Sequence, residues 1–540
     1  MTFIYKIAET SLEFKQIHEL NYRTFVEEIP QHERNESHRL VDKFHKENTY
    51  IICQIDSRVI GMIALRSKRP FSLDGKIGEV EKHLPVTVEN PVEIRLLAVE
   101  KRYRNGRAFL GLAQALVRYC LKVGYDAALI SGTVRELKLY GQLGFLPFAY
   151  MTGTEEAAFQ PMYLTKKTFD AGVAGRITKP PINFLPGPAT VSEGVKKAMI
   201  AEPISHRSTE FGELLKCVKE KLAVLTGANH VQMLQGTGTL ANDVIAGQLS
   251  LMKGKGLICV NGEFSKRLIH HAERFNMAFD TMEVAWGRSF EACELKHLLE
   301  NGSYRWLWTV HCETSTGVLN DLELLKELCS QHHIKLAIDG VSALGTVPVN
   351  LEGVAFASGV SGKGLLSYTG LSFVFHNDKI QKSKRLPRYL DLGVYAETKG
   401  IPYTQSSNLV SALNIALQRY ENPETTFNKI NEDARKIRVA VENAGLEILA
   451  PEAAASPAIV TIQMDEGLTA MQLGETLFLN GFNVHYESDY LRERNWLQIS
   501  SMNDINAKEL DAMLALLHQL VFSYRQGVDL LANDQLKGSN

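Results

Sequence analysis

The chain has 540 residues, more than one hydrophobic core normally organises, so at least two domains are expected. Apolar residues make up 45% and charged residues 22% of the chain, and the net charge of −2 gives no field that would attract nucleic acid or an anionic membrane. No apolar run approaches the roughly 20 residues needed to cross a bilayer, and the first residues are too polar for a secretion signal. The seven cysteines are dispersed without a CxxC pair, which argues against disulfides or a metal site and is typical of a reducing cytoplasm.

The first 165 residues alternate between helix-like and strand-like hydrophobic periodicity. The expected elements are a helix at 11–25, strands at 50–54, 59–65 and 92–99, an amphipathic helix at 109–123, a strand at 127–131, a helix that ends near Leu143, and a strand at 160–164. This order indicates a mixed α/β domain, which we place at residues 1–168.

The loop after the strand at 92–99 combines basic side chains with a glycine at the start of a helix. Free backbone N–H groups and cations at such a place bind pyrophosphate. The loop, the element order and the string Leu139-Tyr140-Gly141-Gln142-Leu143-Gly144-Phe145 resemble the GNAT acyltransferases. The resemblance implies that Tyr140 protonates the departing thiolate. It also implies that the pyrophosphate of acetyl-CoA or another acyl-CoA is held by Arg104, Asn105, Gly106, Arg107 and Ala108.

Alternatives stay open in this domain. Tyr103 replaces the family's usual first loop residue, and the loop arginines and Tyr140 are alternatively a solvated loop and a core tyrosine. No general base is identified, because Glu93 and Glu100 are equally well interpreted as exposed charges at strand ends. The helix containing residues 22–26 is similar to autoinducer-synthase-like members that use long acyl chains, so the acyl carrier is coenzyme A or a carrier protein.

Residues 166–188 are rich in glycine and proline, which interrupts both periodicities and predicts a linker and entry segment at 169–188. Beyond it, strands and helices alternate as in βαβ units. This alternation predicts a mostly parallel sheet within a domain at 189–530, whose smaller α/β subdomain covers roughly 435–530.

Three groups in this domain follow predicted strands. The string Gln235-Gly236-Thr237-Gly238-Thr239 opens a helix, where backbone N–H groups and hydroxyls would hold a phosphate, although glycines there are often plain turn residues. Asp339 ends a buried strand, as a partner for a protonated ring nitrogen or as a helix cap. Lys363 follows the next strand between small residues, where burial near a cation would lower its pKa. These are groups that pyridoxal 5′-phosphate requires.

Together these segments resemble the class V aminotransferases of fold type I, closest to the alanine–glyoxylate and 2-aminoethylphosphonate–pyruvate branch. Further strings that carry the resemblance are Leu185-Pro186-Gly187-Pro188, Ser205-His206-Arg207-Ser208-Thr209-Glu210-Phe211, Asn261-Gly262-Glu263-Phe264 and His311-Cys312-Glu313-Thr314-Ser315-Thr316-Gly317-Val318. The resemblance implies that Lys363 binds the cofactor covalently and that Asp339 pairs with its ring nitrogen.

Four more contacts to the cofactor are implied by the resemblance. Phe264 would stack on the ring, Val341 would pack beneath it, and Ser315 would hydrogen-bond on the side of its 3-hydroxyl group. Thr404 would reach the phosphate of a neighbouring subunit, which implies a homodimer with shared sites. Without the resemblance, Phe264 and Val341 would be interpreted as core residues.

The chain departs from the family at one substrate position. Gln498 stands where the family usually has an arginine for the substrate's carboxylate or phosphonate, and an amide lacks the charged bidentate fork. Either Arg207, Arg492 or Arg494 replaces that arginine, or the amino donor is not a typical α-amino acid.

The sequence therefore predicts a bifunctional enzyme that transfers an amino group between an amine and a keto acid or aldehyde and also acylates an amine. Alternatives are a class V lyase or synthase, and an N-terminal domain that only senses acyl-CoA. A DNA-binding regulator is disfavoured because the N-terminal region shows no helix-turn-helix pattern and no basic excess.

Overall fold

The computed structural model describes residues 2–29, 32–104, 106–153, 158–465 and 467–537. The chain divides into two compact units. One comprises Met1–Ile182 with Glu475–Phe482, and the other comprises Asn183–Gly474 with Asn483–Asn540. No helix within the described ranges is long and apolar enough to cross a membrane.

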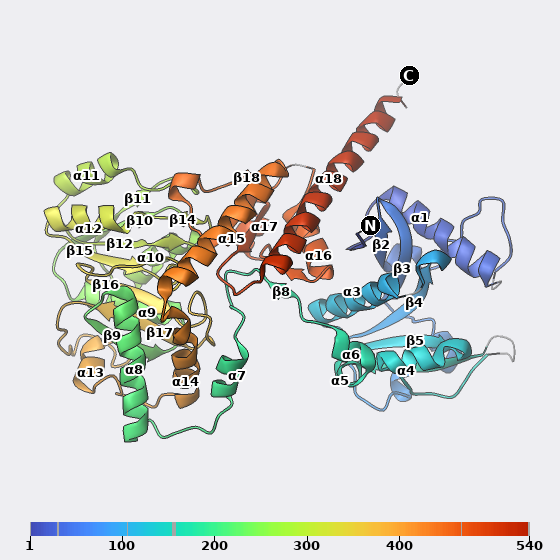
Figure 1. The fold of residues 1–540 in the computed structure, drawn as a ribbon, viewed down its shortest axis with the longest axis horizontal. Coiled ribbons are helices and arrows are strands. Elements are labelled where there is room, and N and C mark those ends of the chain that lie inside the picture. The colour runs from blue at the N-terminus through green and yellow to red at the C-terminus, as the bar shows by residue number, and fades with distance from the viewer. Residues whose placement is uncertain (1, 30–31, 105, 154–157, 466, 538–540) are drawn as a thin grey trace. The chain divides into compact units, whose positions relative to one another are not determined.

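The first unit is built on a seven-stranded sheet in the order β1-β2-β3-β4-β5-β7-β6 (Figure 1). Its strands are β1 (Ile4–Ile7), β2 (Thr49–Ile55), β3 (Arg58–Arg66), β4 (Pro91–Val99), β5 (Ala127–Thr133), β6 (Leu146–Pro147) and β7 (Phe159–Thr165). Neighbouring strands are antiparallel except β4 and β5, which run parallel. These two pair only through Pro91–Glu93 and Ala127–Leu129. Among the described residues no pair joins β4 to β5 beyond that point, so the sheet opens between them.

Helices cover both faces of this sheet. A capping box between Thr10 and Glu13 starts α1 (Ser11–Tyr22), and Ile17 and Leu20 of α1 pack on one face. Leu112 of α3 (Arg107–Val123) packs on the other face. The shorter helices are α2 (Asp74–Ile77), α4 (Leu137–Leu143), α5 (Lys166–Ala171) and α6 (Val173–Ile177).

Two details differ from the sequence-based expectations. The helix expected at 11–25 ends at Tyr22 and continues as a π-helical segment, Arg23–Glu28. The segment expected to be a linker contains α5 and α6, which are too short for a periodicity signal to reveal.

The segment Glu475–Phe482 is integrated into the first unit. The Asn480 amide accepts a hydrogen bond from Tyr5 N at 3.1 Å and donates one to Tyr5 O at 2.8 Å. Arg118 donates to the Leu479 carbonyl at 2.9 Å, and the Leu479 side chain is 1% exposed within the core that α3 forms. A stretch of chain distant in sequence thus completes this unit.

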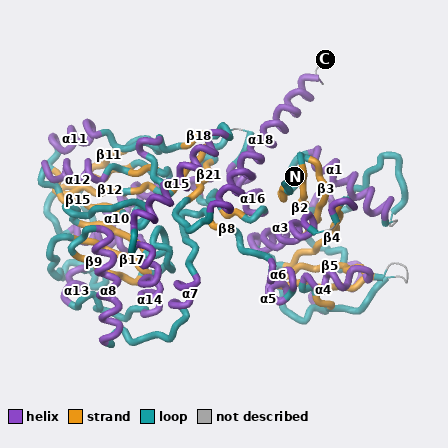
Figure 2. Tube along the Cα trace, viewed as in Figure 1, coloured by secondary structure: helices purple, strands orange, loops and turns teal. Residues whose placement is uncertain are grey.

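The second unit is built on a seven-stranded sheet in the order β11-β10-β12-β15-β16-β17-β9. Its strands are β9 (His230–Gln235), β10 (Lys255–Val260), β11 (Phe279–Glu283), β12 (Tyr304–Val310), β15 (Lys335–Asp339), β16 (Phe356–Val360) and β17 (Leu371–His376). Only β17 runs antiparallel to its neighbours. Figure 2 shows these strands in orange among the purple helices.

Two hydrophobic clusters, one on each face, hold helices against this sheet. Phe211 of α8 and Leu325 of α12 lie in one cluster, and Ala241 of α9 and Leu268 of α10 lie in the other. The helices are α7 (Glu193–Met199), α8 (Thr209–Thr226), α9 (Gly238–Ser250), α10 (Glu263–Arg274), α11 (Ala292–Asn301), α12 (Leu322–Gln331), α13 (Leu392–Glu397), α14 (Ser407–Ala416) and α15 (Pro423–Asn443).

A smaller antiparallel sheet has the order β18-β19-β21. The elements of this region are β18 (Glu447–Ile448), β19 (Ile459–Gln463), α16 (Ala470–Leu479), α17 (Asp489–Arg492), β21 (Trp496–Ser500) and α18 (Ala507–Lys537). The short strands are β8 (Ile182–Asn183), β13 (Cys312–Glu313), β14 (Val318–Leu319) and β20 (Phe482–Asn483).

The fold brings the predicted site strings to one edge of the large sheet. The carboxyl ends of parallel strands meet at one edge, which is where α/β proteins bind ligands. The string at 235–239 follows β9, Phe264 follows β10, and the string at 311–318 follows β12. Asp339 ends β15, and Lys363 follows β16, which pairs with β15.

Candidate active site

Asp339 is buried, with 6% of the residue exposed, and both of its carboxylate oxygens accept hydrogen bonds. Oδ2 accepts from the side-chain amide of Asn242 at 2.8 Å, and Oδ1 accepts from the backbone N–H of Val341 at 2.9 Å. Asn242 lies one turn into α9, so the helix that follows the predicted phosphate loop also orients this carboxylate. Sequence reasoning overlooked Asn242, because only the fold brings it to Asp339.

The amine of Lys363 lies among hydroxyl groups and an aromatic ring. Its Nζ donates to Ser342 Oγ at 2.8 Å and to Thr314 Oγ1 at 3.5 Å, and it lies 5.3 Å from the centre of the Phe264 ring. Burial lowers the pKa of the Lys363 ammonium, and the nearby Asp339 carboxylate opposes part of this shift. The lysine is therefore more readily neutral than a surface lysine, as a nucleophilic amine requires.

Glu313 organises the residues around Phe264. Its fully buried carboxylate accepts from the backbone N–H groups of Phe264 at 3.2 Å and Ser265 at 2.8 Å, at the start of α10. It also accepts from the Ser315 hydroxyl at 2.6 Å. Ser315 Oγ in turn accepts from the N–H of Glu263 at 2.9 Å, so this hydroxyl is engaged within the chain. Glu313 belongs to a string noted in the sequence, but its role was not predicted.

The predicted phosphate loop leads into α9. Thr237 and Thr239 are exposed, and the first N–H groups of a helix have no partner within the helix. Gly238 lies against Val341, because a Cβ at Gly238 would stand 2.9 Å from Val341 Cγ2. The loop, Val341 and Asp339 are therefore neighbours, and a side chain at position 238 would collide with Val341.

Gln498 on β21 is fully buried, and its amide contacts only groups of its own chain among the described residues. The structure thus places this predicted substrate residue beside the 313–318 string, behind Thr314 and Ser315.

The other predicted substrate and phosphate residues lie in different surroundings. Arg494 stacks on Trp286, with its guanidinium carbon 4.0 Å from the ring centre. Arg207 is exposed and donates to the Ile401 carbonyl at 3.2 Å. Thr404 is exposed, and in the described part of the chain no hydrogen bond joins it to Lys363. The guanidinium of Arg267 lies over Phe264, 4.7 Å from the ring centre, although Arg267 was not among the residues predicted from the sequence.

A buried histidine beside this site is expected to make the fold sensitive to acid. His311 is 4% exposed, and burial lowers its pKa to about 4. Between pH 6.5 and 4 the unfolded chain therefore binds more protons than the folded chain, so stability falls as the pH falls, by on the order of 3 kcal/mol for this residue. Calorimetry at several pH values should show that the unfolding temperature of the second unit falls as the pH is lowered. The fall should be smaller in His311→Asn. An equal acid dependence in that variant would contradict the assignment.

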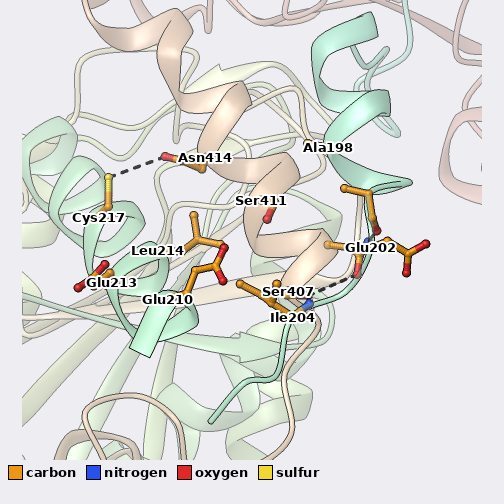
Figure 3. Close-up of a pocket in the computed structure, with 12 residues that line it drawn as sticks. Ala198, Glu202, Ile204, Glu210, Glu213, Leu214, Cys217, Ser407, Ser411 and Asn414 are labelled. Carbon is orange, nitrogen blue, oxygen red and sulfur yellow. Dashed lines mark hydrogen bonds between the residues drawn. The ribbon is translucent and has the colours of Figure 1, made fainter. Parts of the chain in front are cut away.

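One pocket of the second unit is lined by none of the residues around Lys363. It measures about 520 Å³ and opens among α7, α8 and α14 (Figure 3). Its lining includes the acidic side chains of Glu202, Glu210 and Glu213, and none of the residues predicted to bind the cofactor. This pocket does not contain the predicted site, and the site at the sheet edge is identified from its chemistry.

In the first unit, the predicted pyrophosphate loop leads into α3. Gly106 has φ of 113°, which favours glycine, and Ala108 is buried in the first turn. Arg104 donates to the Val99 carbonyl at 2.8 Å and forms an ion pair with Glu28, whereas Arg107 is exposed. Asn105 lies outside the described residues.

Tyr140 lies against β5 beyond the point where β4 and β5 stop pairing. Gly132 of β5 packs against its ring, since a Cβ there would be 3.1 Å from Tyr140 Cδ2. Burial raises the pKa of Tyr140, so the hydroxyl keeps its proton at neutral pH.

The two carboxylates considered as general bases are both buried and occupied. Glu93 accepts from the backbone N–H groups of Ser72 and Leu73 at 2.8 and 3.0 Å. Glu100 accepts from Arg23 and Arg58 at 3.2 and 2.6 Å. The hydrogen bonds of Glu93 and Glu100 hold other parts of the fold, so neither carboxylate is assigned as the general base.

The residues around Lys363 fit pyridoxal phosphate. The cofactor's flat ring needs a cover, a carboxylate for its nitrogen and an amine, and Phe264, Asp339 and Lys363 supply these groups at one edge of the sheet. The N-terminus of α9 supplies N–H groups for a phosphate, and the buried Oδ1 of Asn242 and Nδ1 of His311 have no partner among the described residues. The fold and this set of groups define an enzyme of the fold-type I class.

Comparison with known proteins agrees with this assignment to the fold-type I class. The family model for "Aminotransferase class-V" matches residues 195–409, and that for "Acetyltransferase (GNAT) domain" matches residues 20–114. A soluble hydrogenase 42 kDa subunit from Anabaena cylindrica is 31% identical over 297 residues, which cover 52% of this chain and 77% of that protein. A 2-aminoethylphosphonate–pyruvate transaminase from Pseudomonas fluorescens is 30% identical over 300 residues, which cover 53% of this chain and 81% of that protein.

The solved structure of an alanine–glyoxylate aminotransferase from Nostoc sp. superposes with a TM-score of 0.59 and is 26% identical. The match covers 64% of this chain and 96% of that one. The chain belongs to the class V aminotransferase family, and its match to the GNAT acetyltransferase domain lies at residues 20–114. The predicted family and fold class are thereby confirmed.

Proposed function

We propose that the second unit transfers an amino group between an amine or amino acid and a keto acid or aldehyde, with pyridoxal phosphate as its cofactor. One observation carries this proposal. The Lys363 amine, with a lowered pKa, faces the Phe264 ring at 5.3 Å and lies within electrostatic reach of the buried Asp339 carboxylate. When bound, the cofactor would supply an electron sink for the carbon that carries the amino group.

The chain's own groups would then have distinct roles. Lys363 would hold the cofactor and afterwards move a proton at the substrate carbon. Asp339 would keep the ring nitrogen protonated, Phe264 would cover the ring and exclude water, and the residues at 237–239 would hold the phosphate.

The proposal is tested on the full chain loaded with pyridoxal phosphate. A panel of amines and amino acids is added, and the cofactor's absorbance is followed before and after a keto acid or aldehyde is supplied. Amino transfer predicts a change with the donor that the acceptor reverses. Donor cleavage without reversal would indicate the lyase alternative instead.

We propose that the first unit transfers an acyl group from an acyl-CoA or an acyl carrier to an amine. Support comes from the opening between β4 and β5, the glycine-started helix α3 and the protonated Tyr140 beside that opening. The two activities in one chain would make and acylate an amine, and that coupling is part of the proposal.

Tyr140→Phe is expected to lower the rate of acyl transfer on the order of 100-fold, since it removes the acid for the departing thiolate. Thiol release and mass spectrometry of the N-acylated product measure this rate, and calorimetry measures acyl-CoA affinity, which should not change. Tyr150→Phe, at a tyrosine 64% exposed, is the matched control. Full activity of Tyr140→Phe would remove Tyr140 from the proposal.

A second candidate for the first unit is a sensor that binds acyl-CoA without turnover. It is favoured by one observation, that the carboxylates of Glu93 and Glu100 are both occupied by structural partners. Acyl-CoA binding without any product from a broad set of amines would support the sensor.

We further propose domains at 1–168 and 189–530 joined by 169–188, with a small subdomain at roughly 435–530, and assembly as a homodimer. The dimer is supported by the exposure of Thr404 and by two apolar side chains in the second unit that are largely exposed. These are Ile200 at 83% and Val224 at 87%.

A further inference from the structure

The side-chain amide of Gln498 is held at both ends by its own chain. Nε2 donates to the carbonyls of Thr314 at 2.7 Å and Ser315 at 3.1 Å, and to Thr461 Oγ1 at 2.9 Å. Two carbonyl acceptors fix which end of the amide is the nitrogen. The oxygen Oε1 faces His485 Nδ1 at 2.9 Å and the Tyr490 hydroxyl at 3.3 Å.

The orientation of this amide determines which atom of the histidine partner donates to it. Because Oε1 only accepts, Nδ1 of His485 carries a proton and donates it, while Nε2 faces the Ser488 hydroxyl at 2.7 Å. Burial lowers the pKa of His485, which agrees with a ring that carries one proton. The Gln498 amide therefore donates from one end and accepts at the other within its own chain, and neither end is available to a substrate.

Thr314 connects Gln498 to the lysine. Its carbonyl is held by Gln498, and its hydroxyl shares a hydrogen bond with Ser342 Oγ. Lys363 Nζ contacts these same two hydroxyls, at 2.8 Å for Ser342 and 3.5 Å for Thr314. Each link in this path is a direct contact, and the residues come from four separate segments of the chain.

We propose that Gln498 is a positioning residue that holds Thr314, and through Thr314 and Ser342 fixes the amine of Lys363. The proposal rests on the proposed function of this site and changes the predicted role of Gln498 from substrate contact to support of the lysine. A hydroxyl pair suits this task, because a hydroxyl accepts from a charged amine and donates to a neutral one. Any anion on the substrate is then held by a group other than Gln498.

The test measures cofactor binding without any amino donor present. Cofactor-free protein is mixed with pyridoxal phosphate over a range of pH, and the rate and extent of binding are read from absorbance. In Gln498→Met the rate of cofactor binding on its high-pH plateau should fall at least about fivefold. The pH at which this rate reaches half of its plateau should shift downward, because the Lys363 ammonium loses acceptors that stabilise it. Ser342→Ala should shift the midpoint in the same direction. Gln463→Met, at a partly exposed glutamine on the neighbouring β19, is the matched control and should leave both quantities unchanged.

Two results would overturn the proposal. One is a folded Gln498→Met with wild-type binding kinetics and a raised KM for the amino donor, as direct substrate contact predicts. If Gln498→Met does not fold, Thr461→Val tests the proposal instead. This variant removes one acceptor of the Gln498 amide and keeps the shape of the residue at position 461. An unchanged pH midpoint in Thr461→Val is then the second overturning result. Failure of the wild-type protein to bind pyridoxal phosphate would instead refute the proposed function.

Discussion

Replacing Lys363 by alanine is expected to abolish amino transfer and to remove the absorbance of the lysine-bound cofactor. No other amine is described within hydrogen-bond distance of both Ser342 and Thr314, so no neighbouring lysine replaces it. A loss of at least about 1,000-fold is expected, because in the proposed function both covalent attachment and proton transfer would depend on this amine. Absorbance spectra and single-turnover assays with an amino donor measure the two effects separately.

Two comparison proteins make the Lys363 result specific. Lys363→Arg keeps a positive charge but not a nucleophilic amine, so it should be as inactive as the alanine variant. Lys335→Ala changes an exposed lysine at the start of β15 and should behave as the wild type. Persistence of the lysine-bound absorbance in Lys363→Ala would refute the assignment of this residue.

Replacing Asp339 by alanine is expected to lower the rate of amino transfer by at least about 100-fold. The reason is the loss of the preorganised negative charge that would keep the ring nitrogen protonated. Cofactor affinity should fall as well, because a charge-assisted contact is lost in a buried place. Steady-state kinetics and titration with pyridoxal phosphate measure both quantities.

Asp339→Asn separates charge from shape at this position. Asparagine keeps the size and an oxygen for the Val341 N–H, so the fold should persist while the rate falls. Asp321→Asn alters an aspartate that caps α12 and should leave the kinetics unchanged. Near-normal rates in both Asp339 variants would show that another group pairs with the ring nitrogen.

The sequence predicted where the site lies but not how its residues are supported. Strand ends are visible as apolar runs followed by polar strings, so Asp339 and Lys363 could be assigned to successive strand ends, whereas Phe264 was assigned to the cofactor only through the family resemblance. Glu313 received no role, because its partners at the start of α10 lie about 50 positions away in sequence. Gln498 was interpreted as a substrate residue, since its five side-chain contacts, to residues 314–315, to Thr461 on β19 and to the segment at 485–490, form only in the folded chain.

The same limit applies to charged side chains. Arg104 was assigned to pyrophosphate from its loop, but its ion pair with Glu28 depends on a π-helical segment that periodicity does not reveal. Arg267 lies three positions after Phe264 on a helix, and its place over that ring follows from helix geometry. That spacing was present in the sequence and would have identified it.

The contribution of Glu475–Phe482 to the first unit has a practical consequence. A fragment ending at residue 182 would leave the apolar site of Leu479 open to water and the backbone of Tyr5 without the Asn480 amide. Such a fragment should aggregate or melt early, so poor acylation by it would say nothing about the intact enzyme. A shortened gene that joins this distant segment to the first unit through a short tether would allow the proposed acyl transfer to be measured on that unit alone.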